Sequence, residues 1–301
     1  MNATARDPVI CNDWHPVAGC IDLPIGRVHS TVLLDTPIAV ARRDEQTYLV
    51  WLDPEHRCRH HMPLDAAIIG PTLPATLRYG HLWTSIDEPR HPLFSLPEAD
   101  EAGRRPCHPG SIGVHTGGLR AIENFLDLAH FPFVHTGILG AEPYTEVLDY
   151  TVTINDANEV VATECRFVQP QAALNATGAA EIHYIYRVPR PYTAILYKTC
   201  PLQPERFDVI ALFVQPVTET RCIAHQWICI LDSSSSEAAL RQFQLTIFGQ
   251  DKPILENHRE KRLPLDPRAE MPVRADATSS AYRRWLAGLG VRYGTISASQ
   301  Q

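Results

Sequence analysis

The sequence lacks several features that define whole classes of protein. It contains eight cysteines but no C-x-x-C pair, which favours reduced, buried thiols over a disulfide framework. No stretch approaches the run of about 18 uncharged apolar residues that a membrane-spanning helix requires, so we expect no membrane span. A basic excess is also absent: the net charge of −7 excludes the electrostatic surface of a nucleic-acid-binding protein.

The N-terminal segment MNATARDPVICNDW has no basic stretch followed by an apolar core, as a signal peptide would. We therefore predict a cytoplasmic protein. Proline is abundant, with 25 residues, and this favours turns and edge strands over long helices. The length of 301 residues is sufficient for two domains with separate cores.

The N-terminal part of the chain reads as β-rich. Short alternating segments within residues 14–52, separated by Gly and Pro, predict a small all-β region. Residues 86–118 are rich in Pro, Gly and charge, and predict a linker that wraps a surface. A short helix over about residues 119–131 should follow it.

The rest of the chain predicts an antiparallel sheet followed by a helix. Residues 146–154 alternate as a strand, and the turn at 155–158 joins them to the next strand as a hairpin. Residues 232–262 switch to helical periodicity, with Ser234 and Glu237 spaced as a capping box. Further strands are expected at 181–188, 192–200, 207–217 and 221–231.

The segment ENFLDLAHFPFVH (residues 123–135) places four polar side chains in a mostly apolar run. On one continuous helix, Asn124, Asp127 and His130 lie at i, i+3 and i+6 and stack along one side. A helix that only packs into a core has no need of so many polar groups on one side. The spacing therefore indicates a site rather than a plain core helix.

A second histidine, His135, follows after four residues, and Pro132 predicts a bend that brings the imidazoles of His130 and His135 to one point. Two neutral imidazoles and one carboxylate form the facial triad that leaves open positions on Fe(II) for O₂ and substrate. Asp251 is the candidate carboxylate, because an unpaired charge in its apolar helical stretch would be costly. Asp127 is better suited to accept an N–H from a ligand histidine and fix its tautomer.

Two other interpretations stay open on the residues alone. A single histidine in an apolar run is usually a hydrogen-bonded core residue, although the full N-x-x-D-x-x-H-x-x-x-x-H string is much rarer than a chance pair. The same triad could instead hold zinc and support hydrolysis that needs no electron donor. Iron content and dependence on a reductase would separate these interpretations.

The string ENFLDLAHFPFVH resembles the mononuclear-iron motif of the Rieske non-haem iron oxygenases, and GQDKPILENHR resembles the helix that carries their carboxylate ligand. The order of elements is similar as well. The resemblance implies an α+β fold, with a helix-grip (START-like) catalytic domain built on a curved antiparallel sheet over residues 119–301. A truncated Rieske-like all-β region and linker over residues 1–118 would precede it. The implied ligands of a mononuclear Fe(II) are His130, His135 and Asp251.

The resemblance also assigns roles around the iron. Asp127 would bridge toward the electron donor, and Asn124 would lie close to the site. Helical phase places Phe248, Ile247 and Gln244 on the face of Asp251, where they could contact a flat substrate. The alternative for Phe248 and Ile247 is a plain core role.

The N-terminal region departs from the family pattern, in which C-x-H and C-x-x-H arms hold a [2Fe–2S] cluster. HRCRHHMPL (residues 56–64) resembles the first arm, with Cys58 and His60, but no cysteine lies between Cys58 and Cys107. We therefore predict no Fe–S cluster in this chain, with Cys58 and His60 as remnants or, alternatively, as part of a zinc site. Electrons would come from a partner, a Rieske-containing reductase that uses NAD(P)H and its own [2Fe–2S] cluster and docks close to Asp127.

One branch of the family, the bacterial methylxanthine N-demethylases, includes a subunit without its own cluster. Resemblance to it implies hydroxylation of an N-methyl group by O₂, with 7-methylxanthine giving xanthine and formaldehyde. A further assembly subunit could belong to the complex. The alternative function is a non-catalytic ligand-binding or assembly subunit, although such a role gives no reason to keep His130, His135 and Asp251.

Overall fold

The computed structural model describes residues 7–176 and 178–297. Its N-terminal part contains two three-stranded antiparallel sheets, with strand orders β1-β6-β5 and β2-β3-β4. The three alternating segments predicted within residues 14–52 form β2, β3 and β4, which confirms the predicted all-β region. The elements are α1 (Pro8–Cys11), β1 (His15–Gly19), η1 (Cys20–Asp22), β2 (Val28–Leu33), β3 (Thr36–Arg42), β4 (Tyr48–Leu52), η2 (Leu64–Ala66), β5 (Ala75–Arg78) and β6 (His81–Thr84).

Eight strands of the described chain form one antiparallel sheet, in the order β7-β14-β13-β12-β11-β10-β9, with β8 also paired to β14. The predicted hairpin at residues 155–158 is confirmed. The strand predicted to begin at residue 146 begins only at Thr151, because β10 bulges at Glu164 and pairing ends there. The strands are β7 (Arg105–Cys107), β8 (Ser111–Val114), β9 (Thr151–Ile154), β10 (Val160–Gln169), β11 (Ala180–Arg190), β12 (Thr193–Cys200), β13 (Gln203–Thr218) and β14 (Arg221–Ile230).

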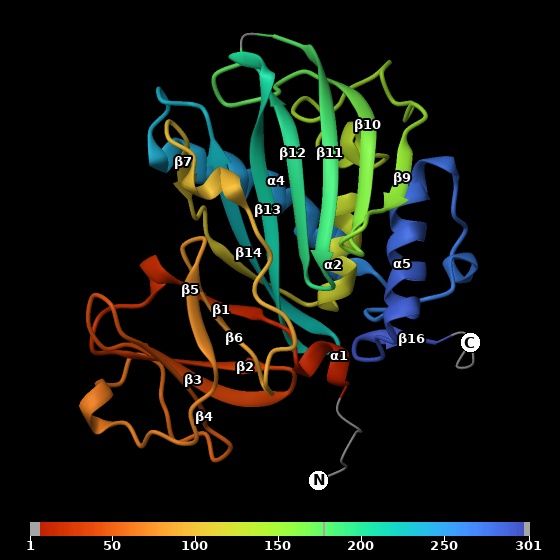
Figure 1. Ribbon diagram of the computed structural model, residues 1–301. Helices are drawn as coiled ribbons and strands as arrows, with labels where there is room; N and C mark the ends of the chain where they lie inside the picture. Colours follow the sequence, from red (N-terminus) through yellow and green to blue (C-terminus); the bar gives the residue numbers. More distant parts are fainter. Residues whose placement is uncertain (1–6, 177, 298–301) are drawn as a thin grey trace.

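Helices cover one face of this sheet, which we call the inner face. Figure 1 shows α4 and α2 behind the sheet and α5 beside β9. The mixed α and β class with antiparallel sheets is thus confirmed. The elements are α2 (Gly118–Leu126), α3 (Phe131–Val134), α4 (Glu237–Asn257), β15 (Leu263–Pro264), η4 (Pro267–Ala269), η5 (Arg274–Asp276), α5 (Ala277–Leu289) and β16 (Thr295–Ile296).

The start of α4 differs from the prediction. The helix is capped by Ser236, whose Oγ accepts the backbone N–H of Ala239 at 3.2 Å. The predicted capping box of Ser234 with Glu237 is wrong, because the Ser234 hydroxyl donates to the Asp232 carboxylate at 2.8 Å instead. None of the helices in the described residues has the length and hydropathy needed to cross a membrane.

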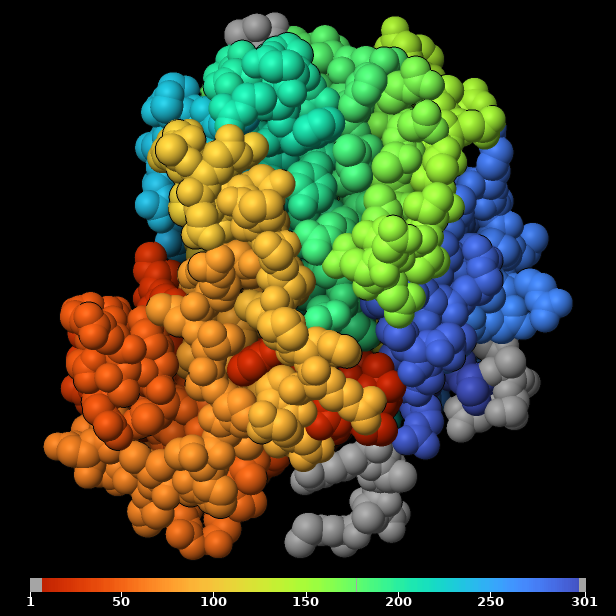
Figure 2. Space-filling view, in the orientation of Figure 1, coloured from red at the N-terminus to blue at the C-terminus, as the bar shows by residue number. Residues whose placement is uncertain are grey.

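Residues 86–118 wrap the molecule as predicted, but they are more than a linker. They form η3 (Pro97–Asp100) and the edge strands β7 and β8. Phe94 and Leu96 are buried against the outer face of the large sheet, opposite the helices. Figure 2 shows this orange to yellow segment running from the N-terminal part over the near face. The cluster that contains Phe94 and Leu96 also includes Tyr79, Trp83, Ile195, Val209, Ala211, Phe213, Trp227 and Cys229.

Candidate metal site and adjoining cavity

The chain between Asn124 and His135 is not one helix. Helix α2 ends at Leu126, Asp127 is extended (φ −82°, ψ 126°), and His130 precedes the separate short helix α3. The predicted stacking along a continuous helix is therefore wrong, and so is the position of the bend. Pro132 lies in the first turn of α3, where its missing N–H costs nothing, so the chain turns before His130 rather than after it.

Tight packing fixes the conformation of the loop that follows His135. Gly140 lies so close to Pro132 that an added Cβ would come within 2.7 Å of the proline nitrogen. The carbonyl of His135 accepts the backbone N–H groups of Ile138 and Leu139, both at 3.0 Å. A side chain at residue 140 would push α3 away and displace His135 with it.

Three donor atoms converge at this point. Nε2 of His135 lies 3.1 Å from Oδ1 of Asp251 and 3.1 Å from Nε2 of His130, and the latter nitrogen lies 3.4 Å from the same oxygen. Donors about 2.1 Å from one ion in adjacent coordination positions are about 3 Å apart. Of the described residues, this is the group of three His, Cys, Asp or Glu donors that is close enough to share an ion. The donor set fits mononuclear iron.

The outward nitrogens of both imidazoles are held by acceptors. Nδ1 of His130 lies 3.2 Å from Oδ2 of Asp127, and Nδ1 of His135 lies 2.9 Å from Oε1 of Gln250. An Nδ1–H that donates to these oxygens leaves the Nε2 lone pair free for a metal. The position expected for Asp127 is thus observed, whereas Gln250 was missed, although an amide directly before the candidate carboxylate was a signal.

Asn124 also lies at the site, as expected. Its amide donates to Oδ1 of Asp251 at 3.2 Å. Burial alone would lower the pKa of His130, but the carboxylates of Asp127 and Asp251 outweigh it and raise the pKa to about 9. Burial likewise opposes ionisation of Asp251, yet its bonds to the two histidines lower its pKa to about 2. Both shifts favour the charged forms, so His130 and Asp251 attract each other at neutral pH.

A cavity of about 120 Å³ opens beside the three donors, between α4 and the inner face of the sheet. Of the predicted substrate contacts, Gln244 and Ile247 line it. Phe248 does not; it packs into the core with 8% of its surface exposed, and Phe243 takes the lining position. The predicted face of α4 is therefore correct for Gln244 and Ile247, and Phe248 lies at its edge, turned into the core. Most of the lining is apolar, which favours a largely apolar ligand.

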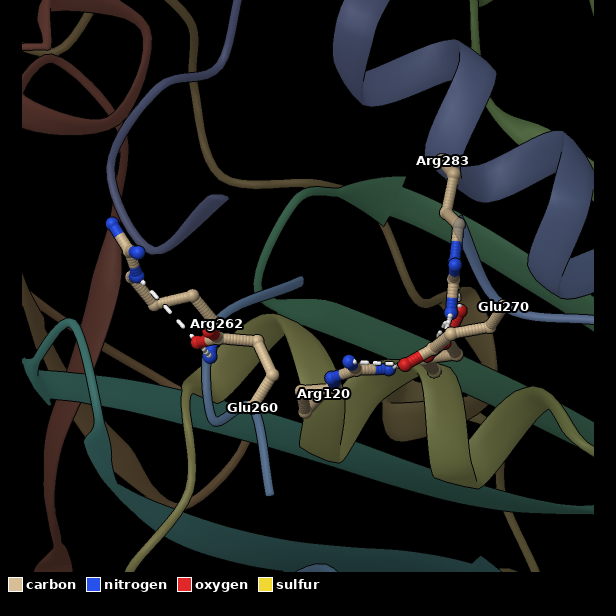
Figure 3. A network of polar contacts seen from close by, with 6 residues as sticks. Arg120, Glu260, Arg262, Glu270 and Arg283 are labelled. Carbon is tan, nitrogen blue, oxygen red and sulfur yellow. Dashed lines mark hydrogen bonds and ion pairs between the residues drawn. The ribbon is translucent and has the colours of Figure 1, made fainter. Parts of the chain in front are cut away.

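A second hollow reaches His130 from the other side. It is lined by Asp127, His130 and Met271 and by an ion-pair network that links α2 to α5. In this network Arg120 pairs with Glu270 at 2.6 Å, and Glu270 also pairs with Arg283, as Figure 3 shows. Because His130 lines both hollows, the triad lies between the cavity and a separate surface.

Cys58 and His60, the residues that resemble a cluster-binding arm, differ in their surroundings. Cys58 is buried in an apolar cluster with Val28 and Trp51, and burial raises the pKa of its thiol. His60 is exposed, with its ring centroid 4.5 Å from that of His29. The absence of an Fe–S cluster from this chain stays a prediction, as does the domain division at residue 118.

Residues 114–292 match the family described as the vanillate O-demethylase oxygenase C-terminal domain. The chain belongs to this family of Rieske non-haem iron oxygenases, which confirms the resemblance inferred from its iron motif. A probable methylxanthine N7-demethylase, NdmC, from Pseudomonas sp. (strain TJI-51) is 45% identical to it over 97% of this chain and 98% of that protein.

More distant relatives share the fold. Methylxanthine N1-demethylase NdmA of Pseudomonas putida is 27% identical over 69% of this chain and 58% of its own length. The solved structure of NdmA with caffeine covers 93% of this chain and 90% of that one, with a TM-score of 0.71 at 20% identity. Dicamba monooxygenase bound to dicamba covers 93% of this chain and 97% of that one, with a TM-score of 0.70 at 16% identity.

Proposed function

We propose that this oxygenase removes an N-methyl group from a methylxanthine, with N7-demethylation of 7-methylxanthine to xanthine as the reaction. The observation that carries the proposal is the convergence of His130, His135 and Asp251 on one point in the wall of an apolar cavity. The likeness to a probable N7-demethylase over nearly the full chain supports the substrate class. Each turnover consumes one O₂, two electrons and two protons, and yields an N–H heterocycle, formaldehyde and water.

The chain's own residues have defined tasks in this reaction. His130, His135 and Asp251 would hold Fe(II), and the bound metal would supply the O₂ activation needed to hydroxylate the N-methyl carbon. Asp127 and Gln250 keep the two imidazoles in the tautomer that binds the metal. The cavity excludes water and orients the purine, so that one methyl group is presented for reaction.

We infer that electrons arrive from a partner reductase with its own [2Fe–2S] cluster. The hollow lined by Asp127 and His130 supports this route, because it approaches the triad on the side away from the cavity. In this proposal, Asp127 connects that surface to His130 by its hydrogen bond.

We also propose a fold assignment for each of the two regions of the chain. Residues 119–301 form a helix-grip domain, an assignment supported by α4 and α2 lying over one face of the large sheet (Figure 1). Residues 1–118 are a shortened Rieske-like region without a cluster. Support comes from the burial of Cys58 among apolar side chains and from the lack of any cysteine between Cys58 and Cys107.

The purified chain, supplied with Fe(II), O₂, NADH, a Rieske reductase and 7-methylxanthine, should release formaldehyde and xanthine in equal amounts. His135→Ala should abolish turnover, whereas the exposed His183→Gln serves as the control. Asp127→Asn should keep its iron but lose about 10- to 100-fold in reductase-dependent turnover. A wild-type chain that binds no iron would indicate the non-catalytic subunit, and zinc-dependent activity without a reductase would indicate a hydrolase.

A further inference from the structure

The sheet wall of the cavity carries a buried lysine that has no role in the metal site. Lys198 lies on β12, is 5% exposed, and lines the cavity with Leu196 and Cys200 from the same face of the strand. Its Nζ lies 5.9 Å from the ring centroid of Tyr184 on β11. Within the described residues, Nζ forms no hydrogen bond or ion pair, so its donors remain available to a molecule in the cavity.

The residue across the sheet from Lys198 does not neutralise it by direct contact. Asp208 on β13 is the register partner of Lys198 and is 8% exposed. Its Oδ1 accepts the backbone N–H of Leu231 at 2.8 Å. Burial lowers the pKa of Lys198 to about 8, although Asp208 opposes that shift, so the ammonium form predominates at neutral pH.

Lys198 and the triad line the same cavity from different elements. His130, His135 and Asp251 come from the helical side of the cavity, and Lys198 comes from the sheet. A flat bicyclic ligand between these walls can present its N-methyl ring to the metal and its other ring to the ammonium. A buried cation in a mostly apolar cavity interacts most strongly with an anionic or polar oxygen, because the local dielectric constant is low.

We propose that Lys198 determines specificity by binding the acidic O=C–N–H edge of the purine's six-membered ring, which selects substrates that carry no methyl group there. This inference rests on the proposed function and deepens it. An N–H beside a carbonyl can lose its proton to give an anion delocalised onto oxygen, and the ammonium stabilises that charge. N-methylation removes the acidic proton, so a fully methylated xanthine gains much less from Lys198.

Equilibrium binding to the full-length, iron-loaded chain without O₂ tests this assignment. Calorimetry would compare 7-methylxanthine, which keeps its ring N–H groups, with caffeine, which has none. The wild-type chain should bind 7-methylxanthine at least about tenfold more tightly, and Lys198→Met should weaken that binding by about 10- to 100-fold. Binding of caffeine should change by less than about threefold, because its carbonyl oxygens can accept from the ammonium but it has no acidic N–H whose loss would give an anion.

Two further variants keep the test decisive. Lys198→Met leaves the Asp208 carboxylate buried without its counter-charge, so the double variant Lys198→Met/Asp208→Asn removes both charges and should lose the discrimination equally. Leu196→Met, on the same strand face, alters the cavity without altering charge and should preserve the ratio of the two affinities.

The outcomes separate this inference from the function on which it rests. One outcome is that the wild-type chain binds both purines while Lys198→Met weakens the binding of both equally or leaves both affinities unchanged. In either case Lys198 does not determine specificity, and the demethylase assignment stands. If the wild-type chain binds neither purine, the proposed function fails and takes the role of Lys198 with it.

Discussion

At the scale of single residues, Gln250 is a site residue that the sequence motif did not predict. Its Oε1 lies 2.9 Å from Nδ1 of His135, which is 1% exposed at its side chain. Gln250→Leu removes this acceptor at similar size, so His135 loses the bond that fixes its tautomer. We expect iron affinity to fall about 10- to 100-fold, as measured by metal titration.

The matched control for that variant lies two turns away on the same helix. Gln242 is an exposed residue of α4, so Gln242→Leu should leave iron affinity unchanged. Equal affinities for the wild-type chain and Gln250→Leu would show that packing alone orients His135.

The sequence predicted individual ligands better than it predicted their surroundings. His130, His135 and Asp251 stand out because charged or titratable groups are rare in apolar runs. Lys198 carried a comparable signal, because strand alternation places it on the face of Ala194 and Leu196, but only the sheet shows that this face is the cavity wall. Phe248 was misplaced because helical phase alone does not tell whether a residue at the edge of the predicted face turns to the cavity or to the core.

At the scale of elements, strands were predicted more reliably than helix ends. Burial alternates with period two in β10 and β11. Strands β13 and β14 instead carry continuous buried runs, because side chains pack on both of their faces. The break between α2 and α3 was not predictable from propensity. It depends on contacts distant in sequence, such as the bond of Asn124 to Asp251, which holds the end of α2 at the site.

The ion-pair network fixes the position of α2. Arg120, 2% exposed at its side chain, pairs with Glu123 and Glu270. Arg120→Met should lower the free energy of unfolding by about 2 kcal/mol, because Glu123, 12% exposed at its side chain, and the more exposed Glu270 each lose one partner. Chemical denaturation would measure the change.

An exposed pair of the same type supplies the comparison. Arg268, 87% exposed at its side chain, pairs with Asp266, and Arg268→Met should leave the free energy of unfolding nearly unchanged. Similar losses from Arg120→Met and Arg268→Met would mean that the network contributes nothing beyond an ordinary surface pair.

At the scale of the whole molecule, buried histidines join the N-terminal part to the large sheet. Nε2 of His81 on β6 lies 3.0 Å from Nδ1 of His108, and His225 on β14 lies in the same polar cluster. Burial, with help from the neighbouring imidazole of His108, lowers the pKa of His81 to about 3. Burial likewise lowers the pKa of His225.

The sign of the resulting pH dependence follows from these shifts. An unfolded histidine titrates near its ordinary pKa of about 6.5 and takes up a proton more readily than folded His81, so stability is full above that pH and declines below it. At pH 5, the protonation of His81 in the unfolded chain should alone lower the free energy of unfolding by about 2 kcal/mol relative to pH 7.5. Urea unfolding at both pH values would measure this loss.

His81→Gln should flatten the acid side of the stability profile, whereas the exposed His91→Gln should leave it unchanged. A profile that stays equally steep in His81→Gln would assign the acid sensitivity to other groups.

The path of residues 86–114 over the outer face decides where this protein can be recombined with a relative. A chimera joined just before Phe94 keeps Phe94 and Leu96 in the outer-face cluster and keeps β7 and β8 paired with β14. A chimera joined after Val114 replaces Phe94, Leu96, β7 and β8 by the relative's sequence, whose side chains would not match the outer face of the sheet. A chimera that replaces the N-terminal region by a complete, cluster-binding Rieske domain of a relative should therefore be joined just before Phe94.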